Sequence, residues 1–257
     1  MHVYRNGLIQ YLQFEAFQHF PELTHAVFTR TGGVSDPPFD SFNMSYTVGD
    51  MNHHVAKNRS VIQDVLGQGK LIHVKQVHGS TIALITDTHE IEANDEKPIS
   101  IADAMITAIP GLFLLIQVAD CQSVMLYDPV TKMIANIHSG WRGSLQNIIG
   151  KTVHEMQTHF QVNPMNIVAG ICPSLGPCCA EFVHYEQEIP KSFWMYKDQG
   201  NHFNFWALSH EQLIKAGVLS EHIHLSQLCT KCHSDLFYSY RKQNITGRFG
   251  CVIGITS

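Results

Sequence analysis

A cysteine and a histidine lie near the two ends of a predicted β-hairpin in the middle of the chain. Two short apolar runs, SVMLYD and KMIANI, flank residues 128–131 (Asp-Pro-Val-Thr), and Asp followed by Pro is typical of a tight turn. A turn centred between residues 129 and 130 would place Cys121 directly opposite His138, with Cβ atoms about 4.5–5.5 Å apart. We therefore predict a thiol and an imidazole side by side where these strands leave the sheet, unless a one-residue bulge breaks the register.

This pair supports two kinds of chemistry. A thiolate and an imidazole can both bind a metal ion, or the thiolate can act as a nucleophile with the imidazole as its base. After His138 comes Ser-Gly-Trp-Arg-Gly, a glycine-rich turn that leads into a helical pattern, and helix N-termini attract small anions. The pair alone leaves both kinds of site open.

The elements that must position the pair are mostly strands. Apolar and β-branched runs predict strands at 7–14, 24–29, 70–75, 81–86, 103–106, 112–118, 166–171, 222–226 and 250–255. Amphipathic spacing predicts helices at 52–66, 145–160 and 206–216, a short helix or strand at 235–242, and a polar loop at 88–98. The run at 112–118, which is apolar except for Gln117, predicts a strand buried on both faces. We expect one α+β domain over residues 1–257, with mixed, largely buried sheets flanked by helices.

The composition of the chain limits the kinds of binding partner that we expect. The 257 residues are 44% apolar and 15% charged, with a formal charge of −5 and a pI near 6.4, which argues against a nucleic-acid or anionic-membrane surface. The apolar runs are too short to span a membrane, and the first residues lack the features of a signal peptide. We therefore expect a cytoplasmic location.

The seven cysteines favour free thiols, metal ligands or a nucleophile over a disulfide framework. Cys172, Cys178 and Cys179 lie in the loop CPSLGPCC, whose spacing is not that of a structural zinc site, so we predict buried or incidental thiols. Cys229 and Cys232 lie in CTKCH, formally a haem-attachment pattern or half of a zinc ribbon. Without an export signal or a second C-x-x-C, chance is the better explanation.

Several short blocks together resemble a known family. They are FTRTGGVS, KQVHG, ADAMIT, VADCQSVMLYD, ANIHSGWRGS, CPSLGPCCAEF, FYSYR and TGRFG, in this order from Phe28 to Gly250. The chain resembles the YfiH-type laccase-domain family, described both as multicopper polyphenol oxidoreductases and as purine nucleoside phosphorylases. The resemblance implies a YfiH-like fold, similar to that of cysteine hydrolases.

The resemblance also implies a metal site of two histidines and one cysteine. Matched block by block, the ligands are His78, Cys121 and His138, which we expect to be catalytic. A thiolate and two imidazoles suit Zn²⁺ with an open fourth position, and Cu²⁺ would bind the same set.

The implied reaction is the cleavage of adenosine, inosine and methylthioadenosine by phosphate, with adenosine deamination as a second activity. Phosphate binding requires arginine. Arg30 is our first choice, counted among the catalytic residues, and Arg142 and Arg248 lie in similar glycine-flanked loops. Gln76 and Asp103 are predicted to bind the purine or handle protons. An open metal position would lower the pKa of a bound water to about 7, as deamination requires.

Two other functions stay open. A copper-dependent polyphenol oxidase is less favoured, because the only paired H-x-H run is His222-Ile223-His224. A metal-free cysteine–histidine hydrolase is the second alternative. For partners we expect a nucleoside and phosphate, no nucleic acid and no membrane, in a monomer or a homodimer.

Overall fold

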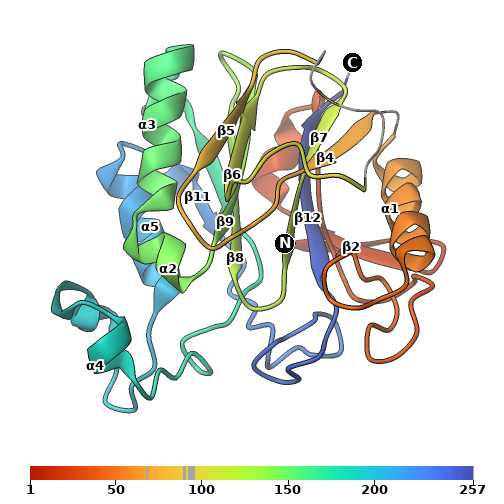
Figure 1. The fold of residues 1–257 in the computed structure, drawn as a ribbon. Helices are drawn as coiled ribbons and strands as arrows, with labels where there is room; N and C mark the ends of the chain where they lie inside the picture. The colour runs from red at the N-terminus through yellow and green to blue at the C-terminus, as the bar shows by residue number, and fades with distance from the viewer. Residues whose placement is uncertain (68, 89–90, 92–95, 257) are drawn as a thin grey trace.

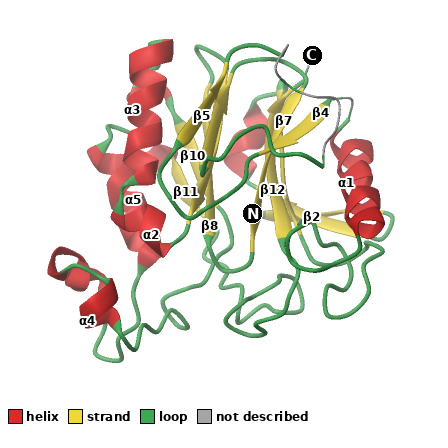
Figure 2. Cartoon of the chain, in the orientation of Figure 1, coloured by secondary structure: helices red, strands yellow, loops and turns green. Residues whose placement is uncertain are grey.

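Two six-stranded sheets pack face to face, and helices cover their outer faces (Figures 1 and 2). The structure is a computed structural model that describes residues 1–67, 69–88, 91 and 96–256. In spatial order, the first sheet comprises β1 (His2–Asn6), β2 (Ile9–Gln13), β3 (Leu23–Phe28), β12 (Phe249–Ile255), β7 (Leu112–Val118) and β4 (Lys70–His73). The second comprises β11 (Ile223–Leu225), β10 (Val168–Ile171), β8 (Gln122–Asp128), β9 (Met133–Ser139), β6 (Ala104–Thr107) and β5 (Ile82–Ile85).

The helices form the outer layers. Helix α1 (Asn52–Leu66) covers the first sheet, and α2 (Trp141–Leu145), α3 (Ile148–Phe160) and α5 (Phe205–Lys215) lie beside the second, while α4 (Tyr185–Glu188) stands apart (Figure 1). Short 3-10 helices are η1 (Glu15–His19), η2 (Pro164–Asn166), η3 (Lys191–Tyr196) and η4 (Ser220–His222). Both sheets are mixed, because β4–β7, β5–β6 and β10–β11 pair in parallel. The predicted α+β fold class is confirmed.

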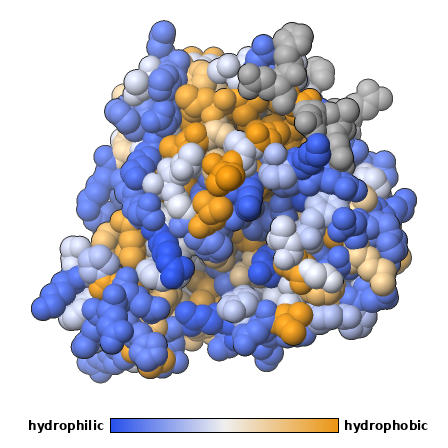
Figure 3. All heavy atoms as spheres, in the orientation of Figure 1, coloured by the Kyte–Doolittle hydropathy of each residue, from blue (hydrophilic) through white to orange (hydrophobic). Residues whose placement is uncertain are grey.

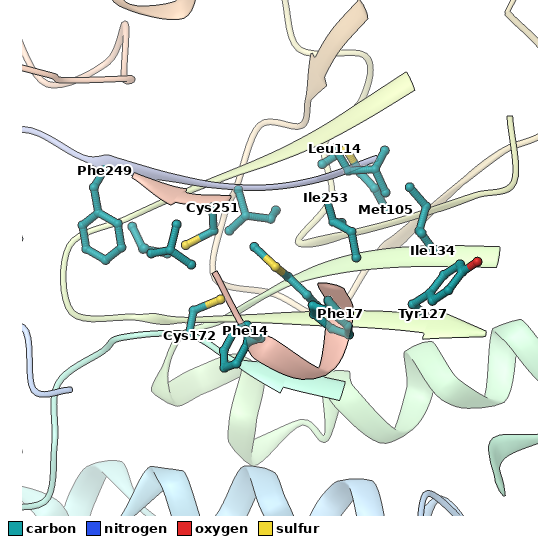
Figure 4. Close-up of a cluster of buried hydrophobic side chains, with 14 of the residues drawn as sticks. Phe14, Phe17, Met105, Leu114, Tyr127, Ile134, Cys172, Phe249, Cys251 and Ile253 are labelled. Carbon is teal, nitrogen blue, oxygen red and sulfur yellow. The ribbon is translucent and has the colours of Figure 1, made fainter. Parts of the chain in front are cut away.

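The position of strand β7 explains why its sequence is apolar from Leu112 to Ile116. Leu114 and Ile116 face the core between the two sheets, whereas Phe113 and Leu115 face the opposite way, into a cluster that includes Ile62 of α1. Alternate residues of a strand point to opposite faces, so both faces are buried, as predicted. Figure 4 shows the inter-sheet core, with side chains from β7, β8, β9 and β12 converging on Phe14 and Phe17.

One buried polar side chain links the sheets. Asn136 of β9 is fully buried and donates from Nδ2 to the carbonyl oxygens of Leu114 in β7 (2.8 Å) and Cys251 in β12 (2.9 Å). Its Oδ1 lies 2.8 Å from the Ser123 hydroxyl, which donates to it. Buried amides must be satisfied in this way, and here the bonds fix the offset between the sheets.

The predicted hairpin register was wrong. Ser123, not Cys121, pairs with His138, and Asp128 pairs with Met133. The Asp128 carboxylate accepts hydrogen bonds from the Val130 amide and the Thr131 hydroxyl, and residue 132 adopts a left-handed conformation. These interactions close a four-residue loop, so Cys121 lies just before β8 and outside the pairing.

Three other elements differ from prediction. The expected helix at 145–160 begins only at Ile148, after the separate short helix α2, because Asn147 has a φ of 57° and its side chain caps α3 by accepting from the Gly150 amide. Residues 235–242 form turns rather than a helix or strand. Strand β1 was not predicted, and residues 89, 90 and 92–95 of the predicted polar loop lie outside the described residues.

Within the described ranges, no helix is both long and apolar enough to cross a bilayer. On the face shown in Figure 3, polar side chains surround a smaller apolar area in the upper middle.

Candidate metal centre and substrate pocket

The structure brings His78, Cys121 and His138 together. His78 lies in the loop after β4, Cys121 immediately before β8, and His138 near the end of β9. Their ligand atoms all lie within 4.8 Å of one another, and the two imidazole rings are 4.8 Å apart at an angle of 79°. Three residues from separate segments therefore converge, as the family resemblance implied. The predicted hairpin register, which had placed Cys121 opposite His138, was nevertheless wrong.

A buried carboxylate orients two of these residues. Asp103 lies 2.8 Å from His138 Nδ1 through Oδ1, and it accepts the backbone N–H groups of His78 (2.9 Å) and Gly79 (2.7 Å). When Nδ1 carries the proton, Nε2 is the ring nitrogen left to bind an ion, an arrangement common among metal-ligating histidines. Asp103 is fully buried and does not line the pocket described below, so its contacts are with His138 and the loop after β4 rather than the predicted contact with the substrate.

The backbone around the three side chains leaves no spare room. A Cβ atom on Gly140 would lie 2.9 Å from His78 Cδ2 and 3.1 Å from Cys121 Sγ, which is closer than side chains normally approach. His78 has a φ of 61° and Asp120 a φ of 93°, a conformation that is uncommon for residues other than glycine. These turns direct the histidine and the neighbouring cysteine towards His138.

Cys121 and His138 also change each other's protonation. Burial alone would raise the pKa of the Cys121 thiol, but the charge on His138 and hydrogen bonds from His138 and His78 lower it to about 6. Burial alone would lower the pKa of His138, but the Cys121 thiolate and the bond to Asp103 raise it to about 9. Near neutral pH, the pair without metal is therefore a thiolate beside an imidazolium.

The donor set fits a soft or borderline divalent ion. A thiolate and two imidazole nitrogens are ligands that Zn²⁺ and Cu²⁺ both accept. The three candidate ligands all line one pocket, so an ion held by them would have its fourth position open to that pocket. This is the pattern of a catalytic rather than a structural zinc site.

The pocket is large enough for a nucleoside with phosphate. Its volume is about 890 Å³, within the range usual for small-molecule sites. Aromatic side chains from several segments form part of its wall: Tyr46, Trp141, Phe182, Phe205 and Tyr240. Basic side chains form another part: Arg59, Lys75, Arg142, Arg241 and Arg248. Such a lining suits a flat ring joined to an anion.

Two of the three arginines predicted to bind phosphate line this pocket, and the third lies elsewhere. Arg142 and Arg248 line the pocket. Arg30 does not. Its guanidinium donates to the carbonyl oxygens of Asp40 and Ser234 and lies 4.7 Å from the Tyr238 ring centre, beside a separate shallow depression.

Arg248 lines the pocket and keeps hydrogen-bond donors that could bind an anion. Its Nη1 donates to the carbonyl oxygens of Thr246 and Gly247, both at 2.9 Å. Among the described residues, none accepts a hydrogen bond from its Nε or Nη2. Burial lowers the pKa of Arg248, while the charges of Cys121 and Asp120 act to raise it, which places the guanidinium within electrostatic reach of the ligand cysteine.

Gln76 lines the pocket but is already hydrogen-bonded. Its side-chain amide pairs with the backbone of Gln117, donating to the carbonyl oxygen (2.9 Å) and accepting from the N–H (3.0 Å). The sequence interpretation missed several wall residues: Arg59, Trp141, Phe182, Tyr240 and Arg241. Of these, Trp141 stands in the block ANIHSGWRGS, Phe182 in CPSLGPCCAEF, and Tyr240 and Arg241 in FYSYR, so the blocks were available as a signal.

The structure thus has three residues that could hold a metal ion, in a pocket with arginines in its wall. The chain belongs to the multi-copper polyphenol oxidoreductase laccase family, whose model matches residues 24–256. The resemblance seen in the sequence blocks is thereby confirmed.

Relatives and solved structures agree with this family. The chain is 30% identical over 247 residues to a purine nucleoside phosphorylase of Bacteroides thetaiotaomicron, covering 91% of this chain and 92% of that protein. It is also 30% identical over 237 residues to the purine nucleoside phosphorylase YfiH of Escherichia coli, covering 88% and 90%. The crystal structure of YlmD from Geobacillus stearothermophilus superposes with a TM-score of 0.87 at 26% identity, covering 99% of each chain.

We predict that Asp103→Asn weakens Zn²⁺ binding about 10- to 100-fold, the usual effect of removing the partner of a ligating histidine. The measurement is competition against a chromophoric chelator. Asp128→Asn is the matched control, since Asp128 is also fully buried but only caps the hairpin loop. Equal affinities for the two variants would contradict the positioning role of Asp103.

We predict that Cys121 reacts with iodoacetamide only after the metal has been removed by a chelator. The rate should then rise through a pH of about 6, because the thiolate is the reactive form and His138 stabilises it. Peptide mass spectrometry identifies the modified cysteine. In His138→Gln the midpoint should move towards about 8.5, the ordinary value for cysteine. Alkylation at the same rate with and without Zn²⁺ would argue for a metal-free nucleophile.

Proposed function

We propose that this protein is a Zn²⁺-dependent purine nucleoside phosphorylase acting on adenosine, inosine and methylthioadenosine, with adenosine deamination as a second activity. The observation that carries the proposal is the open side of the His78–Cys121–His138 site facing a pocket with aromatic and basic walls. The names of the relatives support the same class of reaction. Cu²⁺ remains the alternative ion, because the same ligands accept it.

The proposed roles of the residues follow from their positions. Phosphate attacks C1′ of the ribose while the bond to the purine nitrogen breaks, so the reaction requires an anion held beside the sugar. Arg248 is assigned to that anion, and the aromatic wall is assigned to the purine ring, since stacking on such side chains is worth about 1–3 kcal/mol per base. When held by His78, Cys121 and His138, Zn²⁺ would supply Lewis acidity to the pocket.

The same pocket wall limits water. His138 is buried, Cys121 is half-buried and His78 is exposed, and all three share the pocket with aromatic side chains that would exclude water once a substrate is bound. A low-dielectric surrounding strengthens the attraction between arginine and phosphate. Asp103 keeps the His138 ring fixed, so the site does not have to rearrange when the substrate binds.

A metal-free cysteine–histidine hydrolase is the second candidate, favoured by one observation. Asp103, His138 and Cys121 are arranged as an acid, a base and a nucleophile, and the pKa of Cys121 is already lowered to about 6. The alkylation experiment described above separates this candidate from the metal enzyme, since only a metal ligand is protected by Zn²⁺.

A polyphenol oxidase has less support. His222 lies in η4 and His224 in β11, and neither lines the pocket of Cys121. In the described parts of the chain, the two groups of at least three possible metal ligands contain neither residue. Copper-dependent oxidation of a phenol dye at the Cys121 site would revive this function.

We further propose a cytoplasmic location, where nucleosides and phosphate are available and all seven cysteines, free in the structure, would stay reduced. No nucleic acid or membrane partner is proposed. Whether the enzyme is a monomer or a homodimer stays a prediction.

We predict that wild-type protein releases the purine base from inosine, adenosine and methylthioadenosine only when phosphate is present, and forms ribose 1-phosphate or its 5′-methylthio analogue. Cys121→Ala should lower kcat/KM by more than about 100-fold, because loss of a ligand exceeds the effect of losing a ligand's partner. Chromatography of base and sugar products provides the measurement. Base release without phosphate, or full activity in Cys121→Ala, would overturn the mechanism.

We predict that Arg248→Met raises KM for phosphate roughly 10- to 150-fold, the equivalent of losing about 1.5–3 kcal/mol from hydrogen bonds to a charged group. KM for the nucleoside should change much less. Arg30→Met is the matched control and should leave KM for phosphate nearly unchanged, because Arg30 lies outside the pocket. A raised KM for phosphate in Arg30→Met, with little change in Arg248→Met, would show that Arg30 binds the phosphate instead.

A further inference from the structure

Four cysteines from two loops gather beside the pocket. Cys178 and Cys179 follow Pro177 in one loop, and Cys229 and Cys232 belong to the other. Their sulfur atoms all lie within 4.8 Å of one another. The Cys232 sulfur lies 3.6 Å from the Cys178 sulfur and 3.6 Å from the Cys179 sulfur. The sequence interpretation treated the two loops separately and saw only incidental thiols.

The spacing of the sulfurs matches a single tetrahedral ion. Zinc–sulfur bonds of about 2.3 Å place neighbouring sulfurs of a regular tetrahedron about 3.8 Å apart. A disulfide would need a separation of about 2.05 Å. An iron–sulfur cluster would hold its cysteine sulfurs further apart than a single ion does, because several metal atoms lie between them. A cage of four thiolates also suits Zn²⁺ by ligand type.

The two loops are held in register without help from a metal. Ser174 pairs with Cys229 in a parallel bridge, with hydrogen bonds from the Thr230 amide to the Ser174 carbonyl (3.0 Å) and from the Ser174 amide to the Leu228 carbonyl (3.2 Å). The cysteines are therefore not brought together by chance contacts of two independent surface loops.

Gly176 contacts Cys229 in a way that favours its thiolate form. The Gly176 amide donates to the Cys229 sulfur at 3.3 Å, a contact that stabilises a thiolate. A Cβ atom on Gly176 would lie 3.0 Å from Cys229 Cβ and 2.8 Å from the Trp206 ring, so only glycine allows this approach. Cys229 is buried, whereas Cys178 and Cys232 are exposed, so an ion can enter from the solvent side.

We propose that Cys178, Cys179, Cys229 and Cys232 bind one Zn²⁺ in a closed structural site, separate from the open-sided site of His78, Cys121 and His138. Four protein ligands complete the tetrahedron and leave no position for a substrate.

The proposed ion would brace one wall of the catalytic pocket. The first loop carries Leu175 and the second leads to Tyr240 and Arg241, which line the pocket. Both loops attach to Asp120, the neighbour of Cys121. Its carbonyl accepts from the Leu175 amide (2.8 Å), and its carboxylate accepts from the Thr230 hydroxyl and the Arg241 amide, both at 2.6 Å. The metal would thus fix the loops that hold Asp120, whichever reaction the pocket performs.

The test is the metal content of the folded protein after excess metal has been removed by gel filtration. Plasma mass spectrometry should find two Zn²⁺ per chain in wild type, one in Cys121→Ala, one in Cys232→Ser and none in the double variant. Cys251→Ala is the matched control, since Cys251 is buried outside both groups, and it should keep two. The ion retained in Cys232→Ser shows that this variant has folded.

Cobalt substitution in the Cys121→Ala background identifies the ligands. Tetrahedral Co²⁺ bound by four thiolates gives intense visible absorption and sulfur-to-metal charge-transfer bands, and both should disappear with Cys232→Ser. The same substitution should lower the thermal unfolding midpoint of the zinc-loaded protein. Two results would overturn the proposal: an unchanged zinc count in Cys232→Ser, or a disulfide among the four cysteines in protein purified under reducing conditions.

Discussion

The candidate site depends on the burial of one carboxylate. Asp103 has no access to water, and an uncompensated charge in such a place would cost several kcal/mol. It is compensated by His138 Nδ1 and by the amides of Val77, His78 and Gly79. The Asp103 carboxylate is therefore fully hydrogen-bonded only when the loop after β4 packs against β9. This packing places His78 beside His138.

The sheets supply the rest of the frame. The ends of β4 and β7 bring His73, Gln117 and Val118 to the pocket from the first sheet, and β8 and β9 bring Gln122 and His138 from the second. The pocket therefore lies where the ends of both sheets meet, and its shape depends on their relative offset. The Asn136 side chain holds that offset by bonding to carbonyl groups of both β7 and β12.

The sequence predicted local features well and distant contacts less well. Periodicity placed the helix at 52–66 and the doubly buried strand at 112–118 within the bounds observed. The hairpin register failed because Asp128 lengthens the loop, yet Cys121 still reaches His138, since Asp120 turns the chain just before β8. Spacing in the sequence could not show that His78 lies beside Cys121 and His138, or that the two cysteine pairs lie together. Parallel bridges between segments far apart in the sequence bring these residues together. Arg30 and Arg248 have similar glycine-rich surroundings, and only the fold distinguishes them.

The position of β12 has a consequence for synthesis in the cell. This strand lies between β3 and β7 in the first sheet and pairs with both, although β3 and β7 come much earlier in the sequence. Neither the sheet nor the pocket beside Arg248 can be completed until residue 255 has left the ribosome exit tunnel. Pairing across such long separations is slow, and until then the apolar edges of β3 and β7 are exposed to other chains. The first sheet therefore stays open to wrong pairing for longer than a sheet built from neighbouring segments would.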